Sequence, residues 1–127
     1  MTDAIHTVRE FCAAWEARDQ ERILDSFTED GVYHNMPMPP AKGKDAIKGL
    51  LGMILTPASH VQFEIKHIAA NADVVLTERI DSFKIGDRNV ALPVMGIFEV
   101  RDGKIAAWRD YFDLATWTKQ TNDSPTA

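Results

Sequence analysis

Polar side chains recur two positions apart in three segments that are otherwise rich in apolar residues. The pairs are Tyr33 and Asn35, Arg79 and Asp81, and Trp108 and Asp110. In an extended strand, residues two positions apart lie about 6.6–7 Å from one another and point to the same face. Each pair would therefore present its side chains together, and the Arg79 pair would share its face with Val75 and Phe83.

An arginine between two aspartates is suited to acid–base chemistry. The guanidinium of Arg79 can form forked hydrogen bonds to the carboxylates of Asp81 and Asp110. In an apolar cavity, one carboxyl can keep its proton and act as an acid while the other, ionised, acts as a base. A plainer interpretation stays open, because Arg-x-Asp on a strand is commonly a surface ion pair. Asp110 could equally pair with Arg109 or Lys104 at an exposed edge.

The pair Tyr33 and Asn35 supplies groups that can hold a water molecule. Tyr33 offers a hydroxyl and Asn35 an amide, and both can hydrogen-bond to water. Each of these residues taken singly is more easily explained as structural. Because three strands place polar groups on the face expected to line a cavity, the set as a whole favours a functional site.

Apolar residues spaced three and four apart predict three helices in the first half of the chain. The first has an apolar face over residues 5–15, and Thr2 or Asp3 can serve as its N-cap. The second covers residues 20–27, and the third covers residues 44–55.

Period-two alternation predicts the strands that must present the polar pairs. A short strand begins at Gly31 and ends in the proline-rich segment 36–40, because proline cannot donate to a strand ladder. The second half of the chain then contains four strands joined by short turns, which must run antiparallel. These strands span residues 61–66, 73–85, 89–100 and 104–112. A helical turn near residues 113–118 follows the last strand.

This order of elements predicts one α+β domain over residues 1–118, followed by a polar tail at 119–127. Helices gathered in the first half can cover only one face of the sheet. We therefore expect a curved mixed sheet wrapped around the N-terminal helices. Such an arrangement leaves an internal apolar pocket suited to a small ligand.

Composition excludes several classes of protein. The chain has 127 residues, of which 45% are apolar and 26% charged, so it is long and apolar enough for a single folded core. Its net charge of −5, without a basic stripe, argues against a nucleic-acid partner. No apolar run approaches the roughly 18 residues that a membrane span needs. Cys12 is the single cysteine, so no intrachain disulfide can form, and we expect a cytoplasmic location.

No cofactor or metal ion is expected. The four histidines lack the spacing of known metal sites, and no glycine-rich phosphate loop or dinucleotide fingerprint occurs. Cys12 lies on the apolar face of the first helix, which favours a buried structural role over a nucleophile.

At the level of motifs, the chain resembles the limonene-1,2-epoxide hydrolases. The motifs that carry the resemblance are Tyr33-His34-Asn35, Arg79-Ile80-Asp81 and Trp108-Arg109-Asp110, in the order and on the strands where that family has them. The family belongs to a larger group of cone-shaped α+β domains, which includes the ketosteroid isomerases and the nuclear transport factor 2 fold. The resemblance extends over nearly the whole chain.

The resemblance implies an enzyme that adds water to a lipophilic epoxide in one step and yields a vicinal diol. Asp110 would be the general base that deprotonates the water, and Tyr33 and Asn35 would be that water's other partners. Asp81 would be the general acid that protonates the epoxide oxygen, and Arg79 would bridge the two aspartates. The resemblance also implies a homodimer. The outer face of the meander supports this only weakly, through its alternation of apolar and polar residues.

Several apolar residues are candidates for the pocket wall. They are Trp108, Phe83, Val75, Leu114, Leu50 and Ile54. Two other functions stay open on the same fold, since fold does not determine function. One is a ketosteroid-isomerase-like or polyketide-cyclase-like enzyme, which would not need an arginine between two aspartates. The other is a non-catalytic domain that binds lipophilic ligands.

Overall fold

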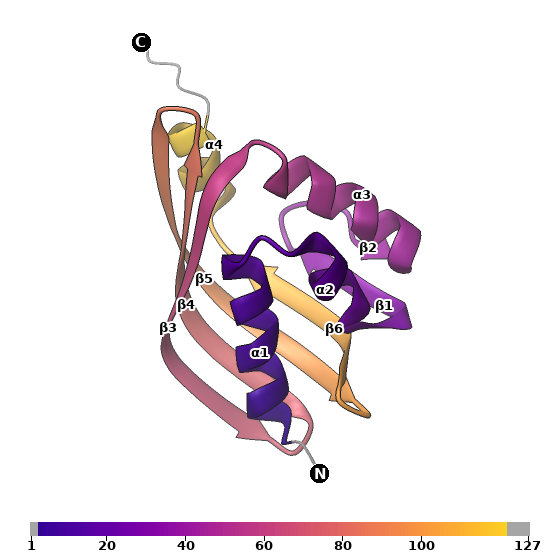
Figure 1. Cartoon of the computed structure of the whole chain (residues 1–127). Helices are drawn as coiled ribbons and strands as arrows, with labels where there is room; N and C mark the ends of the chain where they lie inside the picture. The colour runs from indigo at the N-terminus through magenta and orange to yellow at the C-terminus, as the bar shows by residue number, and fades with distance from the viewer. Residues whose placement is uncertain (1–2, 122–127) are drawn as a thin grey trace.

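The computed structural model describes residues 3–121 and contains four helices and six strands (Figure 1). The helices are α1 (Ala4–Glu16), α2 (Gln20–Asp25), α3 (Lys44–Leu55) and α4 (Leu114–Thr121). The strands are β1 (Phe27–Asn35), β2 (Ala41–Lys42), β3 (Ala58–Asn71), β4 (Val74–Ile85), β5 (Arg88–Arg101) and β6 (Lys104–Tyr111).

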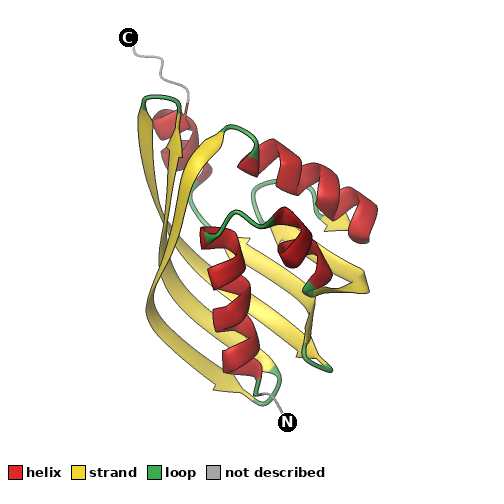
Figure 2. Cartoon of the chain, viewed as in Figure 1, coloured by secondary structure: helices red, strands yellow, loops and turns green. Residues whose placement is uncertain are grey.

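The strands form one sheet in the order β2-β1-β6-β5-β4-β3. β3 to β6 make an antiparallel meander, as the turn signals predicted, and β1 then pairs with β6 in parallel. The sheet curves strongly, and α1, α2 and α3 lie against its concave side (Figure 2). The predicted α+β architecture, a curved mixed sheet wrapped around N-terminal helices, is confirmed.

Local sequence accounts for the start of the first two helices. The side chain of Asp3 accepts a hydrogen bond from the backbone N–H of His6 and so caps α1, one of the two caps expected. The side chain of Asp19 caps α2 in the same way, by accepting from Arg22. α3 spans residues 44–55 as predicted, and it begins after Gly43, whose positive φ of 85° suits glycine.

The prediction for residues 20–36 was partly wrong. α2 ends at Asp25, and Phe27 begins β1 instead of continuing the helix. The physical reason lies far along the chain, since the N–H of Ile105 donates to the carbonyl of Ser26 and Phe27 pairs with Ile105. The two-residue strand β2 was also not predicted. It forms because the chain returns after the proline-rich loop to pair with Val32 and Tyr33.

The end of the domain also differs from the prediction. α4 continues to Thr121, so residues 119–121 belong to a helix, while residues 122–127 of the predicted tail lie outside the described residues. The side-chain amide of Gln120 accepts from the N–H of Ala91 at 2.6 Å and donates to its carbonyl at 3.0 Å. Gln120 thus takes the place of a neighbouring strand at a part of β5 that β6 does not reach.

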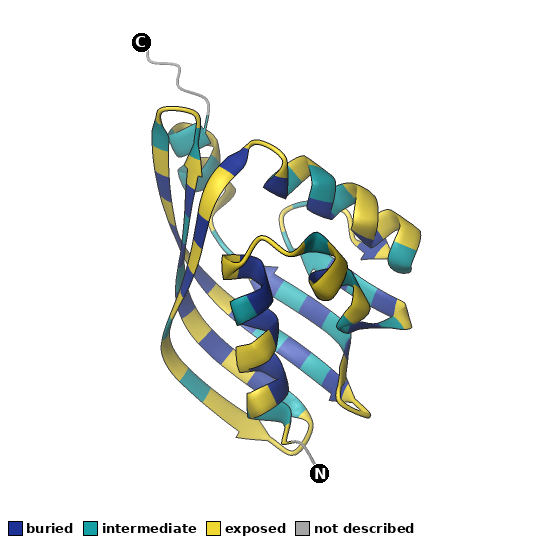
Figure 3. Ribbon diagram, viewed as in Figure 1, coloured by how far each residue is buried: buried dark blue, intermediate teal, exposed yellow. Residues whose placement is uncertain are grey.

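The core lies between the concave face of the sheet and the helices, where buried residues gather (Figure 3). Phe11 on α1 packs edge-on against Phe27, Phe98 and Trp108, with ring centroids 5.0–6.1 Å apart. Among the described residues, no helix has both the length and the apolar character required to cross a bilayer.

Candidate active site

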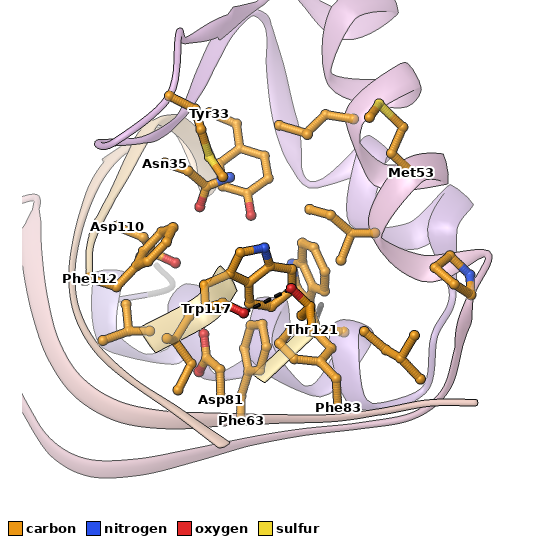
Figure 4. Close-up of a pocket in the computed structure, with 18 residues that line it drawn as sticks. Tyr33, Asn35, Met53, Phe63, Asp81, Phe83, Asp110, Phe112, Trp117 and Thr121 are labelled. Atoms are coloured by element: carbon orange, nitrogen blue, oxygen red, sulfur yellow. Dashed lines mark hydrogen bonds between the residues drawn. The ribbon is translucent and has the colours of Figure 1, made fainter. Parts of the chain in front are cut away.

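A cavity of about 280 Å³ opens between the concave face of the sheet and the helices α1, α3 and α4. Its wall is mainly apolar, and four polar side chains of interest reach it: Tyr33, Asn35, Asp81 and Asp110 (Figure 4). Asp81 and Asp110 approach from neighbouring parts of the sheet. Tyr33 and Asn35 come from β1.

Arg79 on β4 connects the two aspartates from behind the cavity wall. Its side chain is 0% exposed. Nε and Nη2 donate to the two carboxylate oxygens of Asp81 at 2.9 and 2.8 Å. Nη1 and Nη2 donate to the two oxygens of Asp110 at 3.2 and 2.7 Å. One guanidinium therefore holds both carboxylates in forked geometry, which fixes their orientation as well as their separation.

Three neighbours keep the guanidinium and Asp110 in place. The hydroxyl of Thr77 accepts from Nη1 of Arg79 at 3.0 Å. The indole N–H of Trp108 donates to Oδ1 of Asp110 at 2.6 Å. The ring of Phe63 lies 5.0 Å from the Arg79 guanidinium carbon, close enough for a cation–π contact in this dry environment.

Gly96 on β5 makes room for this arrangement. It stands opposite Thr77 on β4 and opposite Asp110 on β6. A Cβ at this position would collide with Nη1 of Arg79 and with Oδ1 of Asp110. Because Gly96 has no side chain, the Arg79 guanidinium can pass over β5 and reach Asp110 on β6.

The parallel pairing of β1 with β6 places the predicted water-holding residues beside Asp110. Asn35 stands opposite Asp110, and Tyr33 stands opposite Trp108. The rings of Tyr33 and Trp108 stack at 4.2 Å with an angle of 4° between their planes. Both Tyr33 and Asn35 point into the cavity, as the alternation of β1 predicted (Figure 4).

Burial changes the proton affinity of the site. Desolvation raises the pKa of Asp81 from its ordinary value of 3.8 to about 6, against the opposing effect of Arg79. Burial likewise raises the pKa of Tyr33, so its hydroxyl keeps its proton. The pKa of Arg79 is raised despite its burial, because Asp110 and Asp81 stabilise the cation. Desolvation raises the pKa of the Cys12 thiol to about 12, which is unlike a nucleophilic cysteine.

Four of the five polar residues selected from the sequence line the cavity, Arg79 joins the two aspartates behind its wall, and three of the six apolar candidates line it. These three are Phe83, Leu50 and Ile54. The other three are corrections. Trp108 is fully buried in the core and touches the site through Asp110. Val75 lies on the correct face of β4 but six residues from Asp81, about 20 Å along the strand. Leu114 is 40% exposed on α4.

Sequence reasoning missed several residues of the site. Thr77 shares the face of Arg79 and Asp81, so the same alternation could have found it. Gly96 has no side chain to attract attention, although a glycine inside a strand can indicate a close approach. Two tryptophans, Trp15 and Trp117, also line the cavity.

No group of three or more His, Cys, Asp or Glu within residues 3–121 is arranged to hold a metal ion. The titratable groups that line the cavity include the two Arg79-bridged aspartates. A protonated carboxyl and an ionised one, held in one apolar cavity, can donate a proton at one point and accept one at another.

Comparison with known proteins supports a specific enzyme family. The model of the limonene-1,2-epoxide hydrolase (LEH) catalytic domain matches residues 2–123. The epoxide hydrolase EphG of Mycobacterium tuberculosis is 37% identical over 109 residues, which cover 84% of this chain and 71% of that protein. The solved structure of an LEH-like epoxide hydrolase of the same organism has a TM-score of 0.77 and 36% identity, covering 92% of this chain and 87% of that one.

More distant structures share the fold alone. A protein of ketosteroid isomerase-like fold from Catenulispora acidiphila matches with a TM-score of 0.80 at 21% identity, covering 91% of each chain. Bal32a, from a soil-derived mobile gene cassette, also has a TM-score of 0.80 at 21% identity, covering 94% of this chain and 96% of that one.

We predict that Gly96→Ala destabilises the protein by roughly 1–3 kcal/mol, because the new methyl group must displace the guanidinium or the Asp110 carboxylate. Urea unfolding of the variant measures this loss. Gly49→Ala is the matched control, because a Cβ at Gly49 in α3 meets nothing within 4 Å. Alanine in an exposed helix interior should stabilise by up to about 1 kcal/mol. Equal effects of the two substitutions would contradict the role given to Gly96.

We also predict a pH dependence of stability that originates at Asp81. The pKa of Asp81 is higher in the folded state than in the unfolded state. Its contribution to the free energy of unfolding is therefore fully present below about pH 4 and is lost as the pH rises through about 6. The free energy of unfolding should fall between pH 4 and 7 by about 2–3 kcal/mol more in the wild type than in Asp81→Asn. Urea titrations of both proteins across this range test the prediction, and parallel pH profiles would refute it.

Proposed function

The chain belongs to the limonene-1,2-epoxide hydrolase family, and from that premise we propose that it opens a lipophilic epoxide by direct attack of water. The reaction forms no covalent intermediate and gives a vicinal diol. The activity class, epoxide hydrolase, follows from the family match and from the relative of 37% identity. The observation that supports the proposed mechanism best is the Arg79 guanidinium shared between two cavity-lining carboxylates.

In this proposal Asp110 is the general base. It accepts hydrogen bonds from Arg79 and Trp108, which suits an ionised carboxylate, an acceptor only. Its register position beside Asn35, next to Tyr33, supports the assignment, since these two can hold a water from other directions. Asp110 takes one proton from this water as the water oxygen attacks an epoxide carbon.

Asp81 is then the general acid. It lines the same cavity, and its pKa of about 6 lets about one-tenth of the side chains keep a proton at pH 7, far more than an ordinary aspartate would. As the carbon–oxygen bond of the epoxide breaks, Asp81 transfers its proton to the departing oxygen, which becomes the second hydroxyl of the diol. Asp110 ends the step protonated and Asp81 ionised, and transfer of one proton back to Asp81 restores the starting state.

The geometry also favours water over an aspartate as the nucleophile. Both oxygens of Asp110 already accept hydrogen bonds, Oδ1 from Trp108 and Arg79 and Oδ2 from Arg79. Such bonds stabilise the carboxylate and lower its reactivity toward carbon.

The mechanism uses no cofactor. The mainly apolar wall, including Phe83, Leu50 and Ile54, supports a lipophilic substrate. The cytoplasmic location stays a prediction.

We further propose that the chain forms a homodimer through the outer face of the sheet. Apolar side chains from three adjacent strands meet there, namely Leu76, Ile80, Pro93, Met95, Ile97 and Tyr111. Met95 is 48% and Tyr111 49% exposed, and they stand opposite each other on β5 and β6. Glu78 stands opposite Met95 and Arg109 opposite Ile97 on this face. A second copy of the same face would remove the apolar side chains around these charges from water.

We predict that Asp110→Asn lowers the rate of diol formation by about 10²–10⁴-fold, because the amide cannot accept the proton from water. Diol should be measured with limonene-1,2-epoxide, cyclohexene oxide, styrene oxide and a long-chain fatty epoxide, after circular dichroism shows that the variant is folded. The matched control is Asp87→Asn in the exposed turn between β4 and β5, which should retain wild-type rates. A folded Asp110→Asn protein with undiminished turnover would rule out Asp110 as the base.

For the proposed dimer, we predict a light-scattering mass of twice 14.2 kDa for the wild type. Met95→Glu places a charge in the centre of the apolar face and should shift the mass toward the monomer. Ala46→Glu, on the exposed side of α3, adds the same charge elsewhere and should leave the dimer intact. A wild-type mass of 14.2 kDa would contradict the proposal.

A further inference from the structure

The two aspartates of the cavity have different neighbours on the strands beside them. Phe63 on β3 and Leu92 on β5 stand opposite Asp81, one on either side of β4. Residues opposite one another on paired strands point to the same face of the sheet, and all three side chains line the cavity. Asp81 therefore lies between two large apolar side chains, and it is 4% exposed.

The neighbours of Asp110 are of another kind. Gly96 stands opposite Asp110 on β5, and Asn35 stands opposite it on β1. A Cβ at Gly96 would collide with Nη1 of Arg79, so the guanidinium fills that side of Asp110. Asp110 thus has a polar group on each side, whereas Asp81 has an apolar side chain on each side.

The Phe63 ring also covers the cation that holds Asp81. The centroid of this ring lies 5.0 Å from Cζ of Arg79. The ring stacks on Trp15 with centroids 5.2 Å apart, and the backbone N–H of Phe63 donates to Oε2 of the Glu16 carboxylate at 2.9 Å. Contacts with α1 therefore fix the ring against the guanidinium, where it excludes water from the ion pair of Arg79 with Asp81.

The charged groups around the cavity act on Asp81 in opposite directions. The loss of hydration has the largest effect and raises the pKa of Asp81, whereas Arg79 lowers this pKa and Asp110 raises it further. Burial raises the pKa of Tyr33 on β1 and of Cys12 on α1, so both are uncharged near neutral pH. Helices α3 and α4 line the cavity with uncharged side chains. The side chains that exclude water from Asp81 therefore determine whether it keeps its proton.

We propose that Phe63 and Leu92 are positioning residues that keep a proton on Asp81 by excluding water from both of its sides. This inference rests on the proposed function, in which Asp81 is the general acid. Arg79 donates two hydrogen bonds to each carboxylate, so the guanidinium does not by itself distinguish the acid from the base. The residues opposite each aspartate on the neighbouring strands separate the two roles.

An NMR titration tests the proposal without turnover. The carboxyl signal of Asp81 in protein labelled with ¹³C-aspartate is identified by its absence from Asp81→Asn, and it should titrate in the wild type with a pKa of about 6. Leu92→Thr brings a hydroxyl, and water with it, to one side of Asp81 and should lower the midpoint by about one pH unit. Phe63→Thr should do the same from the other side, whereas Phe63→Leu keeps an apolar side chain and should retain the wild-type midpoint.

Ile85→Thr is the matched control. It places the same hydroxyl on the same cavity wall, but four residues from Asp81 on β4, about 13 Å along the strand, and should leave the midpoint unchanged. Circular dichroism shows which variants are folded, and Leu92→Thr alone is decisive if Phe63→Thr does not fold. A wild-type midpoint near the ordinary 3.8, an unchanged midpoint in folded Leu92→Thr, or an equal fall in Ile85→Thr would overturn the inference.

The pH profile of epoxide hydrolysis gives a second readout, which a merely structural role would not move. If Asp81 is the acid, kcat/KM falls as the pH rises above the pKa of Asp81, and this fall should begin at lower pH in Leu92→Thr by the same amount as the NMR midpoint. A kinetic profile that stays in place while the NMR midpoint moves would overturn the link between these residues and the reaction. The expected NMR shifts in a protein that hydrolyses none of the epoxides would support the control of the Asp81 proton and contradict the proposed function.

Discussion

The buried guanidinium of Arg79 is the interaction on which the rest of the site depends. A cation without water is costly unless it is fully paired, and here two carboxylates and a hydroxyl accept its hydrogen bonds. The pairing is reciprocal, since the same cation makes it possible to keep two aspartates in a mainly apolar cavity. Removal of Arg79 would leave two buried carboxylates without their cation, so function and stability are coupled at this point of the fold.

The network requires a particular strand order in the sheet, with β5 between β4 and β6. Arg79 and Asp81 come from β4, Asp110 comes from β6, and the strand between them must be crossed without obstruction. Gly96 on β5 provides that crossing. The parallel return of β1 to β6 then brings Tyr33 and Asn35 to the far side of Asp110. Helices α1, α3 and α4 close the cavity around these groups and supply most of its apolar wall.

Much of this site could be predicted from the sequence because strand alternation determines which side chains share a face. That rule placed Arg79 and Asp81 inward, and the structure confirms their burial. The same rule does not determine depth along a strand, which is why Val75 was wrongly assigned to the pocket wall. Helix placement depends on tertiary contacts such as the pairing of Gln120 with Ala91, so the roles of Leu114 and Trp117 were beyond local sequence patterns. The roles of acid and base came from a family resemblance and remain proposals.

The most direct test of the account is a single-turnover reaction in water enriched in ¹⁸O, with enzyme in excess over epoxide. If Asp110 activates a water that attacks carbon directly, one heavy oxygen should appear in the diol and none in the protein. If an aspartate attacks instead, the first diol should contain no heavy oxygen, and mass spectrometry of the digested protein should find the label in Asp81 or Asp110. That second result would contradict the central claim.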